Sequence, residues 1–312
     1  MVIHKVEKKK FLNKWKKGEL IMDKKLKILM IGAHMDDNDF RSAGTALKYV
    51  KAGHSVRFLS VCNGAMGHHE MAPEDVYKRR LEECREASLI SGIEYDNMGL
   101  PECEITASVE NRKKIICYIR EYQPDIIFTH RTNDYHVDHR EVALLVQDAS
   151  YLLIVPHFCP EAKALKKVPL IMYFHDNFTN PKFNPDVVIP TDDVIDTKYK
   201  MINCYVSQVY EWLPWTTGVL AQVPKDPEKR LEWLRNPRVP RDGTLLKEED
   251  LKIPIASNNS EYREARPAIM YRDKIVERYG EKARNTLFAE AFQVSEYGEK
   301  LTKENIDIYF PF

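Results

Sequence analysis

Two short segments of the chain concentrate side chains that bind metals and transfer protons. Residues 34–37 read His-Met-Asp-Asp, and residues 134–139 read Asp-Tyr-His-Val-Asp-His. Ionisable groups this close together are costly unless a cation or a reaction uses them. Histidine and aspartate are typical ligands of catalytic zinc, which takes three protein ligands and leaves one position open for water. The two segments therefore predict a catalytic metal site.

The spacing within each segment is compatible with convergence on one ion. His34 and Asp37 lie three residues apart in the turn after an apolar run, and a third ligand must come from another loop. His136 and His139 share one face of a predicted helix start, so spacing alone leaves open which of them binds metal. A single histidine at such a position is more often an ordinary polar residue, and Asp138 is also a typical helix N-cap. The combination of both segments favours the metal site.

The elements that must position these segments follow an alternating pattern. Short apolar runs alternate with helical periodicity through the first 210 residues, which is typical of an α/β fold. We expect a Rossmann-like, doubly wound and mostly parallel sheet. The predicted strands are 27–31, 56–61, 94–98, 125–129 and 170–174. The predicted helices are 42–52, 73–91, 109–121 and 138–154.

This architecture predicts where the site lies, because open α/β sheets bind ligands beyond the carboxyl ends of their strands. Residues 34–37 follow the first strand, and residues 130–139 follow the fourth. Asn63 follows the second strand, with His68 further along the same loop. We therefore expect these polar groups to meet at one edge of the sheet, with Asn63 and His68 lining the pocket.

The part of the chain beyond residue 208 gives a weaker pattern. Prolines and mixed charge over residues 209–312 predict an irregular cap on the same domain. Helical patterns within it cover residues 261–280 and 281–292. We expect one domain over residues 22–312, with its core at 27–208.

Composition excludes several classes of protein. Lysine plus arginine and aspartate plus glutamate both number 47, so no global charge predicts a nucleic-acid partner. No apolar run is long enough to span a membrane, and the six cysteines form no CxxC pair, which favours reduced thiols and a cytoplasmic location. The lysine-rich residues 1–21 lack the apolar stretch of a secretory signal. We expect them to be a disordered extension, or untranslated if synthesis begins at Met22.

The two segments also carry a family resemblance. Ala33-His34-Met35-Asp36-Asp37 resembles the Ala-His-Pro-Asp-Asp motif of the LmbE-like, or PIG-L, family of zinc-dependent N-acetylglucosaminyl deacetylases. His136-Val137-Asp138-His139 resembles the His-Pro-Asp-His motif of that family. The resemblance covers roughly residues 27–208, and its supporting matches are 61–69, 79–83, 99–101 and 198–208, with a weaker echo at 289–292.

The resemblance implies a role for each residue of the two motifs. The implied zinc ligands are His34, Asp37 and His139. Asp36 would be the general base that activates the attacking water. His136 would stabilise the oxyanion or protonate the leaving amine, and Asp138 would orient it.

The resemblance also points to substrate contacts. It implies that Arg80 contacts a hydroxyl or a phosphate of the substrate, and Tyr135 is a candidate for polarising the carbonyl. Packing is the favoured role of Trp212 and Trp215, although their rings suit a sugar face. Arg41 departs from the family pattern, because it lies in a segment that is usually rich in glycine, and this leaves the substrate open.

The implied function is the metal-dependent removal of an N-acetyl or similar acyl group from an N-acetylglucosamine glycoconjugate. Zinc is the implied metal, although iron, cobalt or nickel suits the same ligands. One alternative is an amidase of the same fold that acts on a non-sugar substrate. A nucleotide-binding module is disfavoured, because residues 32–37 lack the Gly-x-Gly-x-x-Gly turn and two carboxylates would repel a pyrophosphate. The sequence does not predict an oligomeric state.

Overall fold

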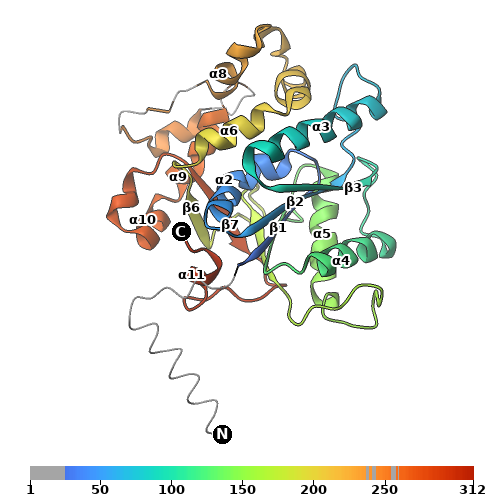
Figure 1. Cartoon of the computed structure of the whole chain (residues 1–312). Coiled ribbons are helices and arrows are strands. Elements are labelled where there is room, and N and C mark those ends of the chain that lie inside the picture. The colour runs from blue at the N-terminus through green and yellow to red at the C-terminus, as the bar shows by residue number, and fades with distance from the viewer. Residues whose placement is uncertain (1–24, 237–238, 241–243, 254–257, 259) are drawn as a thin grey trace.

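The fold is built on a central sheet of seven strands. The computed structural model describes residues 25–236, 239–240, 244–253, 258 and 260–312, so the predicted extension 1–21 and the Met22 start lie outside the described residues. The strand order is β3-β2-β1-β4-β5-β7-β6 (Figure 1). The strands are β1 Lys27–Gly32, β2 Ser55–Cys62, β3 Glu94–Leu100, β4 Ile126–Thr129, β5 Leu170–Phe174, β6 Val187–Pro190 and β7 Ala289–Val294.

The first five strands are parallel and match the predicted ones, which confirms the α/β class. Strand β1 is apolar and buried along nearly its whole length, as expected for a central strand that is covered on both faces. Ile31 lies opposite Leu59 of β2 and Thr129 of β4. This register brings the carboxyl ends of the three strands to one edge.

Helices cover both faces of the sheet (Figure 1). The first helices are α2 Asp37–Lys51, α3 Pro73–Ser91, α4 Val109–Tyr122 and α5 Val137–Leu152. Alternate residues of β1 point into two separate cores: Met30 packs in the core that contains Ala43 of α2, and Leu29 packs in the core that contains Val142 of α5. Because alternate side chains of a strand point to opposite faces, β1 packs against a helical layer on each side of the sheet.

Helix α2 begins at Asp37, not at the predicted Ser42. Its first turn contains Asn38 and Asp39, which are polar and lie outside the predicted helix. Both side chains are buried, and Asp39 accepts hydrogen bonds from the hydroxyls of Tyr95 and Tyr205. The buried partners explain how a polar segment forms a helix start inside the fold.

The C-terminal part contributes to the sheet as well as covering it. Strand β7 lies between β5 and β6 and is antiparallel to both, so residues 209–312 are not only an irregular cap. The predicted helix over 281–292 is wrong: a 3-10 turn, η5 Glu281–Asn285, precedes β7. Alanine and glutamate favour a helix in isolation, but pairing with two strands overrides that propensity here.

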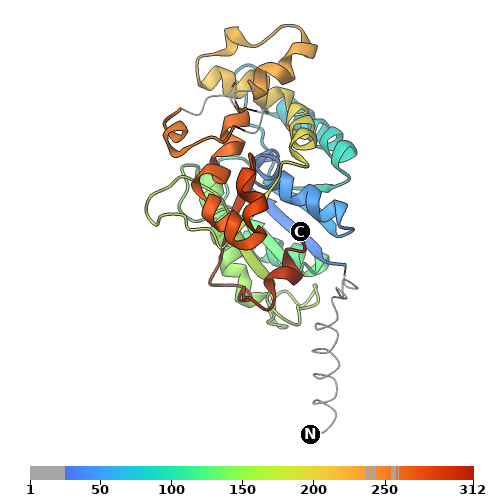
Figure 2. The ribbon, with the colours of Figure 1, turned by 90° about the vertical axis from the view of Figure 1, so that its left-hand side faces the viewer.

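The other helical elements follow β6 in the chain and are coloured yellow to red in Figure 2. Helices α9 and α10 together match the predicted helix over 261–280. No helix among the described residues is long and apolar enough to cross a membrane. These elements are α6 Ile195–Asn203, η1 Ser207–Trp212, α7 Leu213–Thr216, η2 Leu220–Gln222, η3 Pro227–Lys229, α8 Arg230–Arg235, η4 Glu248–Lys252, α9 Ser260–Met270, α10 Arg272–Tyr279 and α11 Ile306–Tyr309.

Candidate metal centre and active site

A cavity of about 350 Å³ lies at the carboxyl edge of the sheet, where the sequence predicts the site. The turn between β1 and α2 supplies one wall, and the loop between β4 and α5 supplies another. This turn is tight at Gly32, because a Cβ atom there would lie 2.8 Å from the Cβ of Asp37. A side chain at position 32 would therefore displace a predicted metal ligand.

The three predicted metal ligands meet in this cavity. The Nδ1 atom of His34 lies 3.1 Å from Nε2 of His139, and that Nε2 lies 3.3 Å from Oδ1 of Asp37. The Asp37 Oδ2 atom lies 3.4 Å from Nδ1 of His34. Tetrahedral ligands at about 2.0–2.1 Å from zinc lie roughly 3.3–3.4 Å from one another. Two imidazoles and a carboxylate at these separations fit a divalent metal ion.

Carboxylates face the outer nitrogen of both histidines. The Nε2 atom of His34 lies 3.3 Å from Glu102 and 3.5 Å from Asp138. The Nδ1 atom of His139 lies 2.9 Å from Oδ1 of Asp134. Such carboxylates hold the proton on the outer nitrogen and leave the inner nitrogen free to bind metal. Sequence reasoning assigns no role to Glu102 or Asp134, although Asp134 belongs to the second segment.

Electrostatics keeps the aspartate ligand ionised. Burial raises the pKa of Asp37, but His139 and His130 more than offset this and hold the pKa well below its usual range. Burial likewise lowers the pKa of His139, and the carboxylates of Asp37 and Asp134 reverse this to a net increase. The negative charge of the Asp37 carboxylate is therefore available to a cation at this centre.

His130 is a fourth imidazole at the centre that sequence reasoning left without a role. Its Nε2 atom accepts a hydrogen bond from the backbone N–H of Ala33 at 3.2 Å and lies 3.2 Å from Asp37. Its ring stacks on His139 with centroids 4.1 Å apart. Burial, then His139, lowers its pKa to about 4, so the ring is neutral. Its position directly after β4 is the sequence signal that could have found it.

Asp36 is paired with Arg80. The Nη2 atom of Arg80 donates to Oδ1 of Asp36 at 2.6 Å, and Nη1 donates to the carbonyl of Gly64 at 3.2 Å. Arg80 lines the cavity but is only 2% exposed. The guanidinium binds Asp36 and the Gly64 turn, and the contact of Arg80 with a substrate stays a prediction. A Cβ at Gly64 would lie 2.8 Å from Nη1.

The structure also changes the relationship between His136 and Asp138. The carboxylate of Asp138 is fully buried, accepts from the Cys103 N–H at 2.8 Å and faces His34. Its nearest approach to Nδ1 of His136 is 4.0 Å. That Nδ1 instead accepts the backbone N–H of Asp138 at 3.1 Å, so His136 is itself the N-cap of α5. The predicted orientation of His136 by the Asp138 carboxylate, and the N-cap role of Asp138, are corrected.

The other predicted contacts separate into two groups. Tyr135 is 71% exposed and lines the cavity beside His136. Asn63 and His68 do not line it, which corrects both predictions. Asn63 accepts from the N–H groups of Ala65 and Glu102 and so shapes its loop. His68 likewise accepts the N–H groups of Glu70 and Met71, so both side chains stabilise the loop after β2.

A column of aromatic rings leads from that loop to the cavity. His68 stacks on His69, His69 on Trp215, and Trp215 on Trp212, with centroids 4.8, 5.1 and 5.2 Å apart. Trp212 lines the cavity, while Trp215 is 48% exposed. The packing role favoured from the sequence is present, and Trp212 additionally offers the cavity an apolar surface.

A buried lysine joins the C-terminal strand to the first helix. The Nζ atom of Lys198 donates to Glu264, to Glu290 at 2.7 Å and to the Phe40 carbonyl at 3.0 Å. Glu290 in turn accepts the N–H groups of Gly44 and Thr45 of α2 at 2.8 and 2.7 Å. The matches at 198–208 and 289–292 therefore support the wall of the cavity.

Comparison with known proteins agrees with this arrangement. Residues 29–150 match the model of the PIG-L family, described as GlcNAc-PI de-N-acetylase. This part of the chain is therefore similar to the PIG-L, or LmbE-like, family. It contains all three predicted metal ligands together with Asp36 and His136.

Individual proteins that resemble this chain share a low sequence identity with it. A diacetylchitobiose deacetylase from Thermococcus kodakarensis is 26% identical over 197 residues, which cover 61% of this chain and 73% of the relative. The deacetylase from Pyrococcus horikoshii shares the fold with a TM-score of 0.59, at 19% identity and 93% coverage of each chain. So does the hydratase GalB from Pseudomonas putida KT2440, with a TM-score of 0.64, at 18% identity over 89% of this chain and 98% of its own. The shared fold therefore hosts different reactions, and the function must be argued from the site.

Proposed function

We propose that this protein is a zinc-dependent hydrolase that removes an N-acetyl group from an N-acetylglucosamine-containing glycoconjugate. The observation that carries the proposal is the convergence of His34, Asp37 and His139, with ligand atoms 3.1 to 3.4 Å apart, beside the carboxylate of Asp36. The family match and the related diacetylchitobiose deacetylase support the choice of acyl group and sugar.

The three converging side chains would hold the ion. A bound zinc ion supplies positive charge that polarises the amide carbonyl and makes water more acidic. Glu102 and Asp134 keep His34 and His139 in the tautomers that this binding needs.

Asp36 is proposed as the general base for the attacking water. Arg80 holds one oxygen of this carboxylate at 2.6 Å, so the orientation of the group is fixed before the substrate arrives. The second oxygen is left to accept the proton as the water attacks the carbonyl carbon. The ion pair thereby positions the base without occupying both of its oxygens.

His136 is proposed as the hydrogen-bond donor to the developing oxyanion, and the proton that Asp36 takes from the water then passes to the leaving amine. Its Nδ1 accepts the backbone N–H of Asp138, which leaves the proton on Nε2. Burial, then the neighbouring His34 and His139, lowers its pKa. A donor that engages the substrate only as charge develops accelerates the reaction beyond simple binding.

The test is acetate release, with zinc stoichiometry measured on the same preparation. The panel contains N-acetylglucosamine, N,N'-diacetylchitobiose and an inositol glycoside of N-acetylglucosamine, with a non-sugar N-acetyl amide as the comparison. We expect release from at least one sugar, abolished by chelator and restored by zinc. Release from the non-sugar amide alone would favour an amidase, and a protein that binds no metal would overturn the site assignment.

A further inference from the structure

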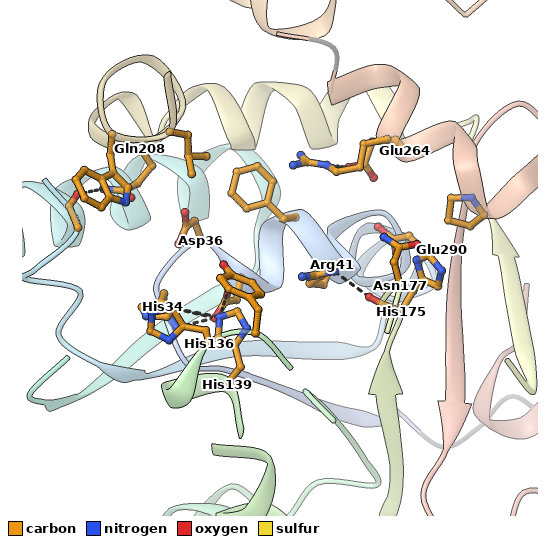
Figure 3. Close-up of a pocket in the computed structure, with 18 of the residues that line it drawn as sticks. His34, Asp36, Arg41, His136, His139, His175, Asn177, Gln208, Glu264 and Glu290 are labelled. Carbon is orange, nitrogen blue, oxygen red and sulfur yellow. Dashed lines mark hydrogen bonds and ion pairs between the residues drawn. The ribbon is translucent and has the colours of Figure 1, made fainter. Parts of the chain in front are cut away.

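The cavity has a second end that the proposed reaction does not use. Figure 3 shows His34, His136 and His139 grouped at one end and His175, Asn177 and Glu290 at the other, with Arg41 between them. The cavity is also lined by Phe40, Arg263 and Pro267. A cavity of about 350 Å³ has room for more than an acetamido group, so a substrate bound at the metal end can extend toward this second end.

The acidic residues at this end are already neutralised. Glu264 and Glu290 both bind the ammonium group of Lys198, and Glu264 also lies 3.5 Å from Nε of Arg263. Two carboxylates thus face two cations. This leaves the charge of Arg41 uncompensated.

Arg41 is held in place without a carboxylate partner. Its Nη1 donates to the backbone carbonyl of His175 at 2.9 Å, and it forms no ion pair with any carboxylate in the described part of the chain. A guanidinium carries five N–H donors, and an isolated charge that is partly buried is costly. The fixed and partly buried guanidinium of Arg41 is therefore a ready partner for an anion.

Two other residues that line the cavity have polar atoms without a partner. The guanidinium of Arg263 lies 4.7 Å over the ring of Phe40, and its Nη2 atom is buried with no hydrogen-bond partner among the described residues. His175 contributes no negative charge, and its Nε2 atom likewise is buried with no partner there. The unpartnered N–H group of Arg263 is consistent with a ligand that supplies an acceptor.

We propose that Arg41 binds an anionic group, a carboxylate or a phosphate, on the part of the substrate that lies beyond the amino sugar. The inference rests on the proposed function, because it assumes that the acetamido group occupies the metal end. A planar guanidinium recognises both groups through paired hydrogen bonds. Arg41 is thus a specificity-determining residue, and the substrate class is an acidic glycoside.

The test measures binding with ligands that the enzyme cannot turn over. The methyl, carboxymethyl and 2-phosphoethyl glycosides of glucosamine share the deacetylated sugar and differ in the charge of the aglycone. Calorimetry is performed on the zinc-loaded wild type, on Arg41→Gln and Arg41→Lys, and on Arg85→Gln as the control. Arg85 is an exposed arginine of α3 paired with Glu82, so this control removes the same charge outside the cavity.

We expect the wild type to bind at least one anionic glycoside about 10-fold or more tighter than the methyl glycoside. The Arg41→Gln variant should lose this preference, Arg41→Lys should keep part of it, and Arg85→Gln should keep all of it. The better of the two anionic ligands identifies carboxylate or phosphate. Equal affinity of the wild type for all three, or an equal loss for all three in Arg41→Gln, would overturn the proposal.

The same ligands in their N-acetyl form separate this inference from the proposed function. Acetate release at equal kcat/KM from all three would leave the deacetylase standing and reject the role of Arg41. An Arg41-dependent preference for an anion without any acetate release would reject the deacetylase and retain the anion site.

Discussion

The Nη2 atom of Arg80 lies 2.6 Å from Oδ1 of Asp36, and both side chains are shielded from solvent. A buried ion pair is weak evidence for stability, but removal of one partner leaves an uncompensated charge. In this site the surviving partner would be the proposed general base. The pair therefore links the geometry of catalysis to the packing of α3.

Arg80→Met tests this link. We expect kcat to fall about 100-fold or more with metal content unchanged, because Asp36 loses its fixed orientation. The free energy of unfolding should fall by about 3–5 kcal/mol, because the carboxylate is left unpaired. Acetate release, zinc content and urea unfolding measure the three effects. Exposed Arg85 provides the matched Arg85→Met control, and a kcat within threefold of wild type for Arg80→Met would refute the link.

Glu102→Gln tests the carboxylate behind His34. The substitution keeps the shape but removes the charge that lies 3.3 Å from Nε2 of His34. Zinc affinity should fall about 10- to 100-fold, as is usual when the partner of a metal-bound histidine is lost. Competition with a chromogenic chelator measures the affinity. Glu104→Gln, at an exposed site two residues away, should bind zinc like the wild type, and an equal loss in both variants would argue against the role of Glu102.

Three alanine variants separate the proposed roles at the metal. Asp36→Ala should retain zinc and lose about 10²- to 10⁴-fold in turnover, as expected for the loss of a general base. His136→Ala should also retain zinc and mainly lower kcat, because its interaction forms in the transition state. His139→Ala should lose zinc together with activity. The assignment fails if Asp36→Ala strips the metal or if His139→Ala binds it normally.

His175 gives the fold a dependence on pH. Burial, with the positive charges of Arg41, Arg266 and Arg131, lowers its pKa to about 3, against ~6.5 in an unfolded chain. Only the unfolded state then gains a proton as pH falls below ~6.5, so stability is full above that pH and decreases below it. Between pH 7.5 and 5.5 the loss should be about 1.4 kcal/mol.

Urea unfolding at the two pH values measures this loss in wild type and in His175→Asn. The variant should lack this part of the pH dependence. His157→Asn, at an exposed position, should retain it. Identical pH dependence in wild type and His175→Asn would contradict the assignment.

Lys198→Met tests the buried junction between α6, α9 and β7. Burial lowers the pKa of Lys198, but Glu264 and Glu290 reverse this to a net increase, so the lysine is charged at neutral pH. Its removal leaves two glutamates close together in the interior and should cost about 3–5 kcal/mol of unfolding free energy. Lys200→Met changes an exposed lysine of the same helix and should cost less than about 0.5 kcal/mol. Equal losses would show that the buried charge is not the cause.

The parts of the site that could be predicted are those encoded locally. His34 and Asp37 lie on one turn, and His136 and His139 on one helix start, so the strand order alone brings them to one edge. The first five strands were predictable for a similar reason, because central parallel strands are continuous apolar runs.

The parts that could not be predicted depend on partners distant in the chain. Glu290 lies in a segment of helix-forming residues, and only pairing with β5 and β6 makes it a strand. The pairing of Arg80 with Asp36 and the position of Arg41 against His175 likewise need the folded structure. Charge and periodicity give no signal for such contacts.

The contact between Glu290 and α2 also sets an order of events during synthesis. The helix that carries Asp37 receives this partner from a residue synthesised 246 positions after Gly44. A nascent chain that has emerged only as far as η1 already contains every proposed metal ligand, yet Lys198 lacks Glu264 and Glu290, and β5 lacks its neighbour β7. Contacts this distant in sequence form late in folding. The proposed metal site therefore reaches its final geometry only after β7 has joined the sheet.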